Sequence, residues 1–295
     1  MFFCRHRLIC STVLGLSLAA CGESSREAHV LRDDFGNPIQ LGPVPTRIVS
    51  LSPATTEILF TIGAGSRLVG RSRYDLWPDS ARLVPDLGDG MRPNVEAVLG
   101  ARPDLVVLYA SPDNRNAADR LRAAGINTLA LRMDHIAQFK GATGLLGAVL
   151  HDSARAQTVI DSVQNTLDSV RRATATLPHP TVFWHIWDSP LITIGSGSFM
   201  NELVEIAGAR NVYADIQGAS GQIALEDVAR RNPDFILAGP DGSRQISSDP
   251  RWRIVRAARA GKIIVVDTGV VARPSVRLGE AAVSLARALH PGLFR

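Results

Sequence analysis

Short apolar runs alternate with amphipathic stretches in two separate groups along the chain. In the first group, helical spacing of the apolar positions predicts helices near 55–62, 94–99 and 117–124. The strand-like runs of the first group are RIVSL (47–51), LVVLYA (105–110) and NTLAL (127–131). Those of the second group are TVFWHIW (181–187), LITI (191–194), FILAG (235–239) and IIVVD (263–267). Strands that alternate with helices indicate βαβ units. The pattern therefore predicts two α/β lobes, each with a mainly parallel sheet.

Between the two groups, the apolar positions change to a continuous helical spacing. From about Ile136 to Ala175, apolar residues recur three and four positions apart, which predicts a helix. At about 1.5 Å per residue, one helix of this length would reach roughly 50–60 Å, far longer than an average globular helix. The Asp-Ser pair at 152–153 offers a place for a bend, and Pro178 ends the pattern. We expect one long helix that joins the two lobes.

Two pairs of matching phrases indicate that the lobes are related to each other. SPATTEILFTIGAG and SGSFMNELVEIAGA each carry a glutamate, Glu57 or Glu202, six residues before a Gly-Ala pair. VEAVLGARPDLVVL and LEDVARRNPDFILA each carry a glutamate, Glu96 or Glu226, seven residues before a Pro-Asp pair that leads into a strand. Two such matches in the same order are difficult to produce by chance. We predict an internal repeat.

The beginning of the chain has the layout of a signal peptide. Arg5 and Arg7 precede an apolar run at 8–20, which is shorter than the roughly 20 residues that span a bilayer. All three cysteines, Cys4, Cys10 and Cys21, lie in this part. The rest of the chain therefore offers no disulfide, no cysteine nucleophile and no thiolate metal ligand.

Charge and motif content exclude several classes of function. The formal charge of +4 falls to +2 without the two leader arginines (4 − 2), and no basic run or basic-aromatic stripe indicates nucleic-acid binding. The seven histidines are scattered, without the spacing of a metal site, so we expect no metal and no cofactor. The sequence also has no G-x-S-x-G elbow and no P-loop, so we expect no catalytic residues.

Three phrases resemble those of the helical-backbone (class III) periplasmic binding proteins, the receptors of ABC importers for vitamin B12, iron-siderophores and haem. The phrases are RIVSLSPATTEILFTIGAG, PNVEAVLGARPDLVV and NELVEIAGARNVY, and the resemblance covers about Pro45 to Pro291. It is closest to the vitamin B12 receptors. It implies two Rossmann-like α/β lobes with mainly parallel sheets, joined by one long backbone helix, and a binding protein rather than an enzyme.

The resemblance also implies a domain organisation and a location. The predicted parts are a lipoprotein signal peptide (1–20), a tether and lead-in (21–44), an N-terminal α/β lobe (45–135), a linking backbone helix (136–177) and a C-terminal α/β lobe (178–295). LAAC at 18–21 resembles a lipobox, which implies lipidation of Cys21 and a lipid-anchored protein in the periplasm or at the cell surface. An ordinary secretory cleavage site is the alternative.

In this family each lobe presents one surface glutamate to arginine pockets on the membrane permease. Matched phrase to phrase, those residues are Glu57 and Glu202. A carboxylate near a helix start is favoured by the helix dipole, and an arginine can bind it in a bidentate manner. The alternative is that both glutamates only stabilise their helices. We expect a monomer whose partners are a ligand and the permease subunits, with the lipid anchor as its only membrane contact.

Ligands of open α/β sheets bind beyond the carboxyl ends of the strands. The candidate loops there are LSPA, GRSRYDLWP, DGMRP, YASPDN, HIWDSP and DTGVVARPS. GRSRYDLWP resembles the aromatic loop of the vitamin B12 receptors, and an arginine near the ligand of those receptors matches VVARPS. The predicted ligand-binding residues are Ser52, Pro53, Tyr74, Trp77, Met91, Trp187 and Arg273.

A corrinoid is the ligand that these residues favour, because flat aromatic walls suit a large, partly apolar macrocycle. The sequence departs from the vitamin B12 pattern in DIQGASGQIAL, which has no tryptophan, at Gly269, which is not acidic, and in the valines before Arg273. A ferric siderophore, favoured by Arg71 and Arg73, and haem remain alternatives. The third alternative is a tetrapyrrole- or nucleotide-processing α/β enzyme, which the export signal argues against.

Overall fold

The computed structural model describes residues 1, 31–39 and 41–293, and one compact unit begins at Leu31. The predicted signal peptide, the beginning of the tether and the lipidation site Cys21 lie outside the described residues. Among the helices of the described part, none is long and apolar enough to cross a membrane. The domain boundaries given above stay predictions.

The first sheet has four parallel strands in the order β2-β1-β3-β4. Its strands are β1 (Ile48–Ser50), β2 (Leu68–Arg71), β3 (Leu105–Tyr109) and β4 (Asn127–Leu131). Its helices are α1 (Pro53–Thr61), α2 (Val95–Gly100) and α3 (Pro112–Ala123), with the 3₁₀ turns η1 (Gly65–Arg67) and η2 (Asp79–Leu83). Helix α3 begins earlier than predicted because the Ser111 side chain caps its first turn and Pro112 fits the first helical position.

The second sheet has the order β10-β9-β5-β6-β8, and β7 pairs with β5. Strands β10, β9, β5 and β7 run parallel, whereas β6 is antiparallel to β5 and β8. The strands are β5 (Thr181–Asp188), β6 (Leu191–Ile194), β7 (Arg210–Asn211), β8 (Ser220–Gln222), β9 (Phe235–Ala238) and β10 (Ile263–Val265). The helices are α6 (Phe199–Ile206), α7 (Leu225–Arg231), α8 (Pro240–Ser248), α9 (Arg256–Arg259), α10 (Thr268–Val271) and α11 (Leu278–Leu289), with the turn η3 (Pro250–Ile254). The predicted fold of two mainly parallel sheets is confirmed.

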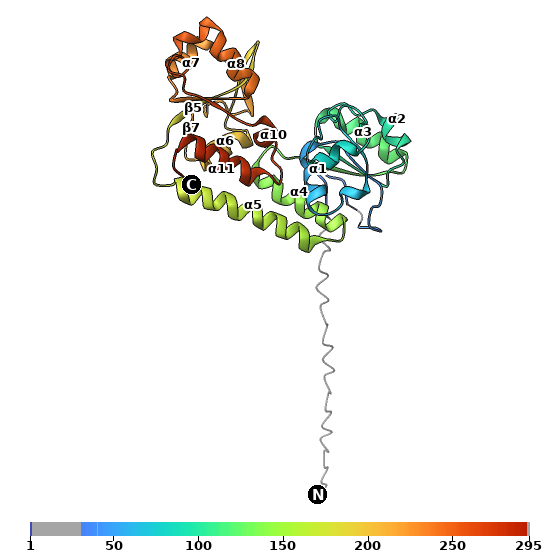
Figure 1. Ribbon diagram of the computed structural model, residues 1–295. Helices are drawn as coiled ribbons and strands as arrows, with labels where there is room; N and C mark the ends of the chain where they lie inside the picture. The colour runs from blue at the N-terminus through green and yellow to red at the C-terminus, as the bar shows by residue number, and fades with distance from the viewer. Residues whose placement is uncertain (2–30, 40, 294–295) are drawn as a thin grey trace. The chain divides into compact units, whose positions relative to one another are not determined.

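The segment between the two sheets forms two helices, α4 (Ile136–Val149) and α5 (Ser153–Thr174), rather than one (Figure 1). The prediction of a single helix 50–60 Å long is therefore wrong, and α5 alone is about 33 Å long. His151 has a positive φ of 56°, and the Asp152 side chain caps α5 by accepting from the backbone N–H of Arg155. Gly147 lets the helices pack closely, since a Cβ there would lie 2.4 Å from that of Ala156.

The largest apolar cluster continues through both sheets and the helices between them. It contains Ile48 of β1, Leu146 of α4, Leu167 of α5, Val182 of β5 and Leu285 of α11, all nearly inaccessible to water. Burial of one such side chain is worth about 1.5–3 kcal/mol. Smaller clusters cover the outer faces of the two sheets. The shared core makes the two lobes one packed unit at the level of α4, α5 and α11.

Candidate functional site

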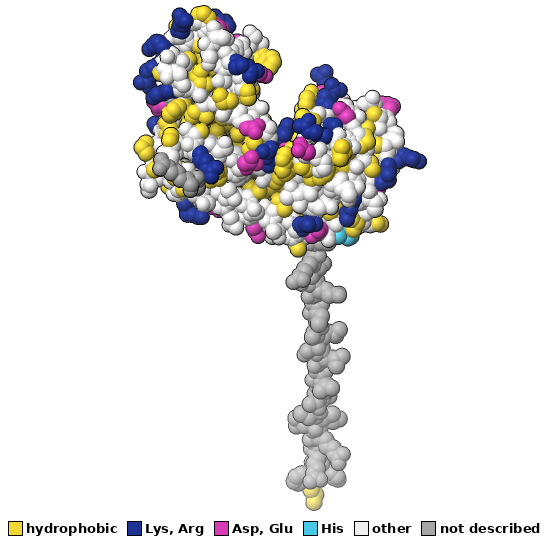
Figure 2. Space-filling model, viewed as in Figure 1, with side chains coloured by type: hydrophobic (Ala, Val, Ile, Leu, Met, Phe, Trp, Pro, Cys, Tyr) yellow, Lys and Arg dark blue, Asp and Glu magenta, His cyan; other side chains and the backbone are white. Residues whose placement is uncertain are grey.

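A cavity of about 570 Å³ lies at the carboxyl ends of the first sheet's strands, and we call it the central pocket. Its lining residues are Leu51, Ser52, Pro53, Ala54, Ser72, Tyr74, Gly90, Met91, Tyr109, Met133, Asp134, Phe199, Ala272, Arg273 and Pro274. Most follow β1 to β4, as expected for an α/β sheet. The others come from the start of α6 and from the segment after α10, so both lobes contribute. Figure 2 shows that the molecule is hollowed between the lobes, with apolar, basic and acidic side chains along the walls.

The central pocket is largely apolar. Tyr74 and Met91 are about half exposed, whereas Met133 and Phe199 are largely buried. Aromatic rings and methionine side chains adapt to flat, irregular ligands. The lining residues thus provide a surface for a bulky apolar group.

Among the described residues of the lining, Asp134 is the acidic and Arg273 the basic side chain. Tyr109 donates a hydrogen bond to Asp134, and burial together with this carboxylate raises the pKa of Tyr109 to about 12. The phenol therefore stays protonated at neutral pH. The guanidinium of Arg132 lies 3.9 Å from Asp134 and balances part of its charge.

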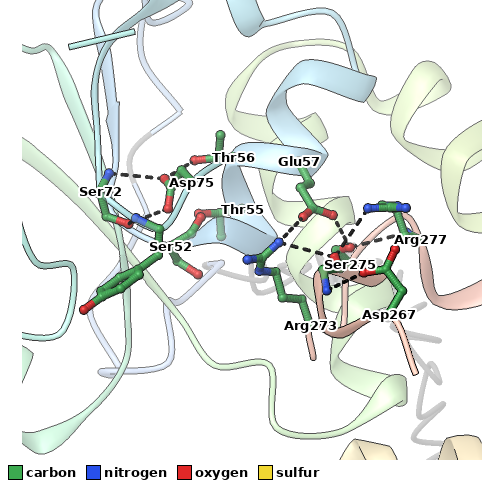
Figure 3. Close-up of polar contacts among 12 residues, drawn as sticks. Ser52, Thr55, Thr56, Glu57, Ser72, Asp75, Asp267, Arg273, Ser275 and Arg277 are labelled. Carbon is green, nitrogen blue, oxygen red and sulfur yellow. Dashed lines mark hydrogen bonds and ion pairs between the residues drawn. The ribbon is translucent and has the colours of Figure 1, made fainter. Parts of the chain in front are cut away.

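Arg273 is paired with a carboxylate of the other lobe (Figure 3). Its Nη1 lies 3.3 Å from Oε1 of Glu57, and the hydroxyl of Ser275 donates to Oε2 of the same carboxylate. The Glu57 side chain is only 1% exposed. Burial raises the pKa of Glu57, although Ser275 and Arg273 act in the opposite direction. In the pocket, Arg273 is therefore a partly neutralised cation.

A second buried carboxylate, Asp75, holds the loop that carries Tyr74. It accepts hydrogen bonds from the Ser72 hydroxyl, the Ser72 backbone N–H and the Thr56 hydroxyl, and Figure 3 shows all three side chains converging. Burial raises the pKa of Asp75 against these hydrogen bonds. Because Thr56 and Glu57 are neighbours in α1, one helical turn anchors loops from both lobes.

Another cavity, of about 520 Å³, lies beside β5, and we call it the β5 pocket. Trp187 lines it at 62% exposure, with its indole N–H donating to the carbonyl of Ser189. His185 lies in its wall, and burial lowers the pKa of this imidazole. Its Nε2 is 3.5 Å from Asp188 and has no hydrogen-bond partner among the described residues. The two pockets share Ala272.

The structure brings most of the predicted ligand-binding residues together. Ser52, Pro53, Tyr74, Met91 and Arg273 line the central pocket. The structure places the two predicted tryptophans elsewhere. Trp187 lies in the β5 pocket, and the half-buried ring of Trp77 has the guanidinium of Arg277 5.3 Å from its centre.

The predicted ligand-binding residues omit ten residues of the central pocket, of which Met133, Asp134 and Phe199 also lie outside the candidate loops. Tyr109 lies in the predicted loop YASPDN, and Met133 and Asp134 follow β4, so the strand-end rule contained the signal for three of them. Phe199 comes from the start of a helix in the other lobe. No local pattern indicates its position.

The expected surface position of Glu57 is wrong, because this side chain is buried against Arg273 and Ser275. Glu202 is 31% exposed and accepts hydrogen bonds from Nδ1 of His135 and the backbone N–H of Ile136. The other matched pair, Glu96 and Glu226, lies in the first turns of α2 and α7, and both residues are exposed.

Arg71, which favoured an anionic ligand, is also buried and donates to the backbone carbonyl of Ser72. It does not line the central pocket, and neither does the exposed Arg73. Among the described histidine, cysteine, aspartate and glutamate residues, no group of three or more could hold a metal ion.

Two relatives cover most of the chain. It is 29% identical over 273 residues to the uncharacterized ABC transporter substrate-binding lipoprotein YvrC of Bacillus subtilis (strain 168), covering 89% of this chain and 86% of that protein. It is 27% identical over 281 residues to a cobalamin-binding protein of Halobacterium salinarum, covering 88% of this chain and 73% of that protein.

Solved structures with the same fold have different ligands in their names. The periplasmic vitamin B12 binding protein BtuF of Vibrio cholerae matches with a TM-score of 0.73 at 22% identity, over 83% of this chain and 96% of that one. A periplasmic heme binding protein of Pseudomonas aeruginosa matches with 0.75 at 23% identity, over 84% and 94%. The molybdate-bound MolA of Haemophilus influenzae matches with 0.77 at 21% identity, over 89% and 91%. At these identities the likeness concerns the fold.

The family model described as periplasmic binding protein matches residues 48–268, about three quarters of the chain. Its two mainly parallel sheets and the lobe-spanning pocket agree with that match. The chain thus belongs to the class III periplasmic binding proteins, the non-enzymatic substrate-binding proteins of ABC transporters.

Proposed function

We propose that the ligand of this ABC-transporter substrate-binding protein is a corrinoid, bound in the central pocket and delivered to a membrane permease. The observation that carries the proposal is the combination of a largely apolar lining with almost no free positive charge. Among the described residues that line the two pockets, Arg273 is the only lysine or arginine, and it is paired with Glu57.

The charge of the pocket lining favours a corrinoid over haem and ferric siderophores as the ligand. A corrin macrocycle carries neutral amides around its edge, which suit a tyrosine hydroxyl, a carboxylate and a partly neutralised arginine. Haem carries two carboxylates, and ferric catecholates carry several negative charges. Such ligands need uncompensated cations in the site, because burial of an unpaired charge is costly. The described lining offers no cation that is free of a carboxylate partner.

Size and relationship support the same ligand. A cavity of about 570 Å³ alone is smaller than a whole corrinoid, but the adjoining β5 pocket, with Trp187 at its rim, extends the apolar surface. The relative from Halobacterium salinarum is named for cobalamin binding. A ferric siderophore or haem is the alternative, which the haem-binding structures of the same fold support.

Equilibrium titration of the purified protein tests this proposal. Cyanocobalamin and dicyanocobinamide should bind at micromolar concentration or below, whereas haemin, a ferric catecholate and molybdate should bind at least tenfold more weakly. Tyr74→Ala and Phe199→Ala, which shorten the pocket wall, should each weaken corrinoid binding about tenfold. Leu83→Ala, at an exposed apolar residue outside the pocket, is the matched control. Tighter binding of haemin or of the ferric complex would contradict the corrinoid assignment.

Permease docking needs acidic residues that the permease can reach. Of the predicted docking pair, Glu57 is buried and only Glu202 reaches the solvent, so we propose that the exposed pair at matched positions of the repeat, Glu96 and Glu226, docks to the permease. Both lie in first helical turns, where the helix dipole favours a carboxylate. In Figure 1, α2 and α7 both lie on the side of the compact unit away from α5. Exchange of both for arginine should abolish corrinoid uptake by cells while leaving ligand affinity unchanged. Normal uptake by that variant would refute the assignment.

A further inference from the structure

The central pocket contains one basic side chain whose charge is controlled from outside the pocket. Arg273 belongs to the lining, but its carboxylate partner Glu57 does not. The partner comes from α1 of the first lobe, and the arginine follows α10 of the second lobe. Glu57 is held in place by Ser275, which donates to its other oxygen. The carboxylate thus has a fixed position next to a pocket wall that it does not form.

Glu202, the counterpart of Glu57 in the repeat, also contacts residues outside its own lobe's sheet, but none of them is a basic residue of the central pocket. Glu202 in α6 of the second lobe accepts from His135 and from the backbone N–H of Ile136, at the start of α4. In both cases a glutamate from the first helix of one lobe contacts the segment that leads into a helix outside its own lobe's sheet, which is α11 for Glu57 and α4 for Glu202. His135 is not a residue of the central pocket, however. Glu202 therefore provides a natural comparison for Glu57.

We propose that Glu57 is a specificity-determining residue, which offsets the charge of Arg273 and thereby makes the central pocket favour uncharged ligand edges over carboxylates. This inference rests on the proposed function, since it takes the central pocket as the ligand site. The pair lets Arg273 keep N–H groups for an amide oxygen without presenting a full positive charge. Without the Glu57 carboxylate, the same guanidinium would attract a carboxylate of the ligand.

A pair of nearly isosteric ligands tests this role. In the monocarboxylic acid derivatives of cyanocobalamin, one peripheral amide is hydrolysed to a carboxylate, so that shape is kept and one negative charge is added. The wild-type protein should bind cyanocobalamin at least tenfold more tightly than these acids. Glu57→Gln keeps an acceptor for Ser275 and removes the charge, and it should lower this preference at least fivefold. An unchanged preference would overturn the proposal.

Glu202→Gln is the matched control, because it changes the repeat-equivalent carboxylate without touching Arg273. It should leave the preference within twofold of the wild type. An equal loss in both variants would show a general structural effect and would contradict the proposal. If Glu57→Gln fails to fold, Arg273→Gln tests the same pair, because it removes the positive charge of the pair and keeps the negative one. It leaves the Glu57 carboxylate unpaired and should raise the preference for the amide.

Two further measurements separate this inference from the proposed function. Absence of any corrinoid binding by the wild type would refute the proposed ligand alone, and haemin would then be compared with its uncharged dimethyl ester in the same variants. The pairing itself is measured without ligand, by a double-mutant cycle of Glu57→Gln and Arg273→Gln in urea unfolding. The two changes should be coupled at least tenfold in the unfolding equilibrium constant. A coupling below threefold would overturn the inference whatever the ligand is.

Discussion

Glu57 and Glu202 lie six residues before a Gly-Ala pair in related helices, yet their side chains have different surroundings. Glu57 is 1% exposed and faces an arginine and a serine, whereas Glu202 is 31% exposed and faces a histidine and a backbone N–H. In water an ion pair contributes little, and in a dry site the loss of one partner is expensive. The same repeat position therefore carries two different energetic roles, which the partner residues decide.

Removal of Arg273 should give the largest effect on stability. Arg273→Ala leaves the Glu57 carboxylate buried without its cation, and loss of one partner of a buried pair costs about 3–5 kcal/mol. Urea unfolding at pH 7 measures the free energy of unfolding. Arg244→Ala, which breaks an exposed ion pair with Asp241, is the control and should have no measurable effect. A loss below about 1 kcal/mol for Arg273→Ala would show that the contacts of Glu57 contribute no more to stability than the exposed contacts of Glu202.

The second buried carboxylate should give the next largest effect. Asp75→Ala removes the acceptor of three hydrogen bonds from Ser72 and Thr56, which costs about 2–3 kcal/mol when the donors stay buried. The variant should also weaken ligand binding, because Asp75 fixes the loop of Tyr74. Asp79→Ala, at an exposed acid of the following turn, is the control. Equal stability of the two variants would contradict the anchoring role of Asp75.

The buried carboxylates should also make stability depend on pH. The pKa of Glu57 and that of Asp75 are raised in the folded protein, so the folded state binds protons more tightly than the unfolded chain. Their contribution to stability is complete below the ordinary carboxyl range and is lost as pH rises through the folded-state values. Relative to Glu57→Gln, the wild type should therefore lose stability as pH increases from 4 towards neutrality. Leu83→Ala changes no ionisable group and should follow the wild type at a constant offset.

The sequence predicts the fold well because local patterns determine most of it. Strands β1, β3 and β4 of the first sheet end within a residue of their predicted positions, since apolar β-type runs bounded by turns are a local signal, whereas β2 is not predicted. The end of α4 before Asp152 is only weakly indicated by the sequence, because the apolar spacing continues across it. The feature that separates α4 from α5 is the left-handed backbone of His151. Local periodicity does not contain that information.

The site is harder to predict, because its decisive contacts join residues that are distant in sequence. Glu57 meets Arg273 and Ser275 across 216 and 218 positions. A helical pattern places Glu57 near a helix start but does not say whether water or an arginine faces it. In the same way, the aromatic loop is recognisable, although its pattern does not tell that Tyr74 lines the pocket and Trp77 does not. Both distinctions depend on what the second lobe contributes.

Removal of His135, the partner of Glu202, should have only a small effect on the free energy of unfolding. His135→Ala removes a half-exposed pairing partner, and exposed pairs of this kind contribute about 0.2–1 kcal/mol. The free energy of unfolding should fall by no more than that, and the effect should diminish at high salt. A loss comparable to that of Arg273→Ala would mean that burial does not determine how much the partners of Glu57 and Glu202 contribute to stability.

An effect of similar size is expected for Trp77, whose ring contacts Arg277 of the second lobe. The guanidinium of Arg277 lies over its ring and also binds Glu280, so the aromatic side chain joins the two lobes. Trp77→Leu keeps an apolar group and removes the cation–π contact, which is worth about 0.5–1 kcal/mol at a partly exposed site. Ligand affinity should stay unchanged, whereas Tyr74→Leu, in the same loop, should lower it. A tenfold loss of affinity in Trp77→Leu would restore the ligand-binding role predicted for this residue from the sequence.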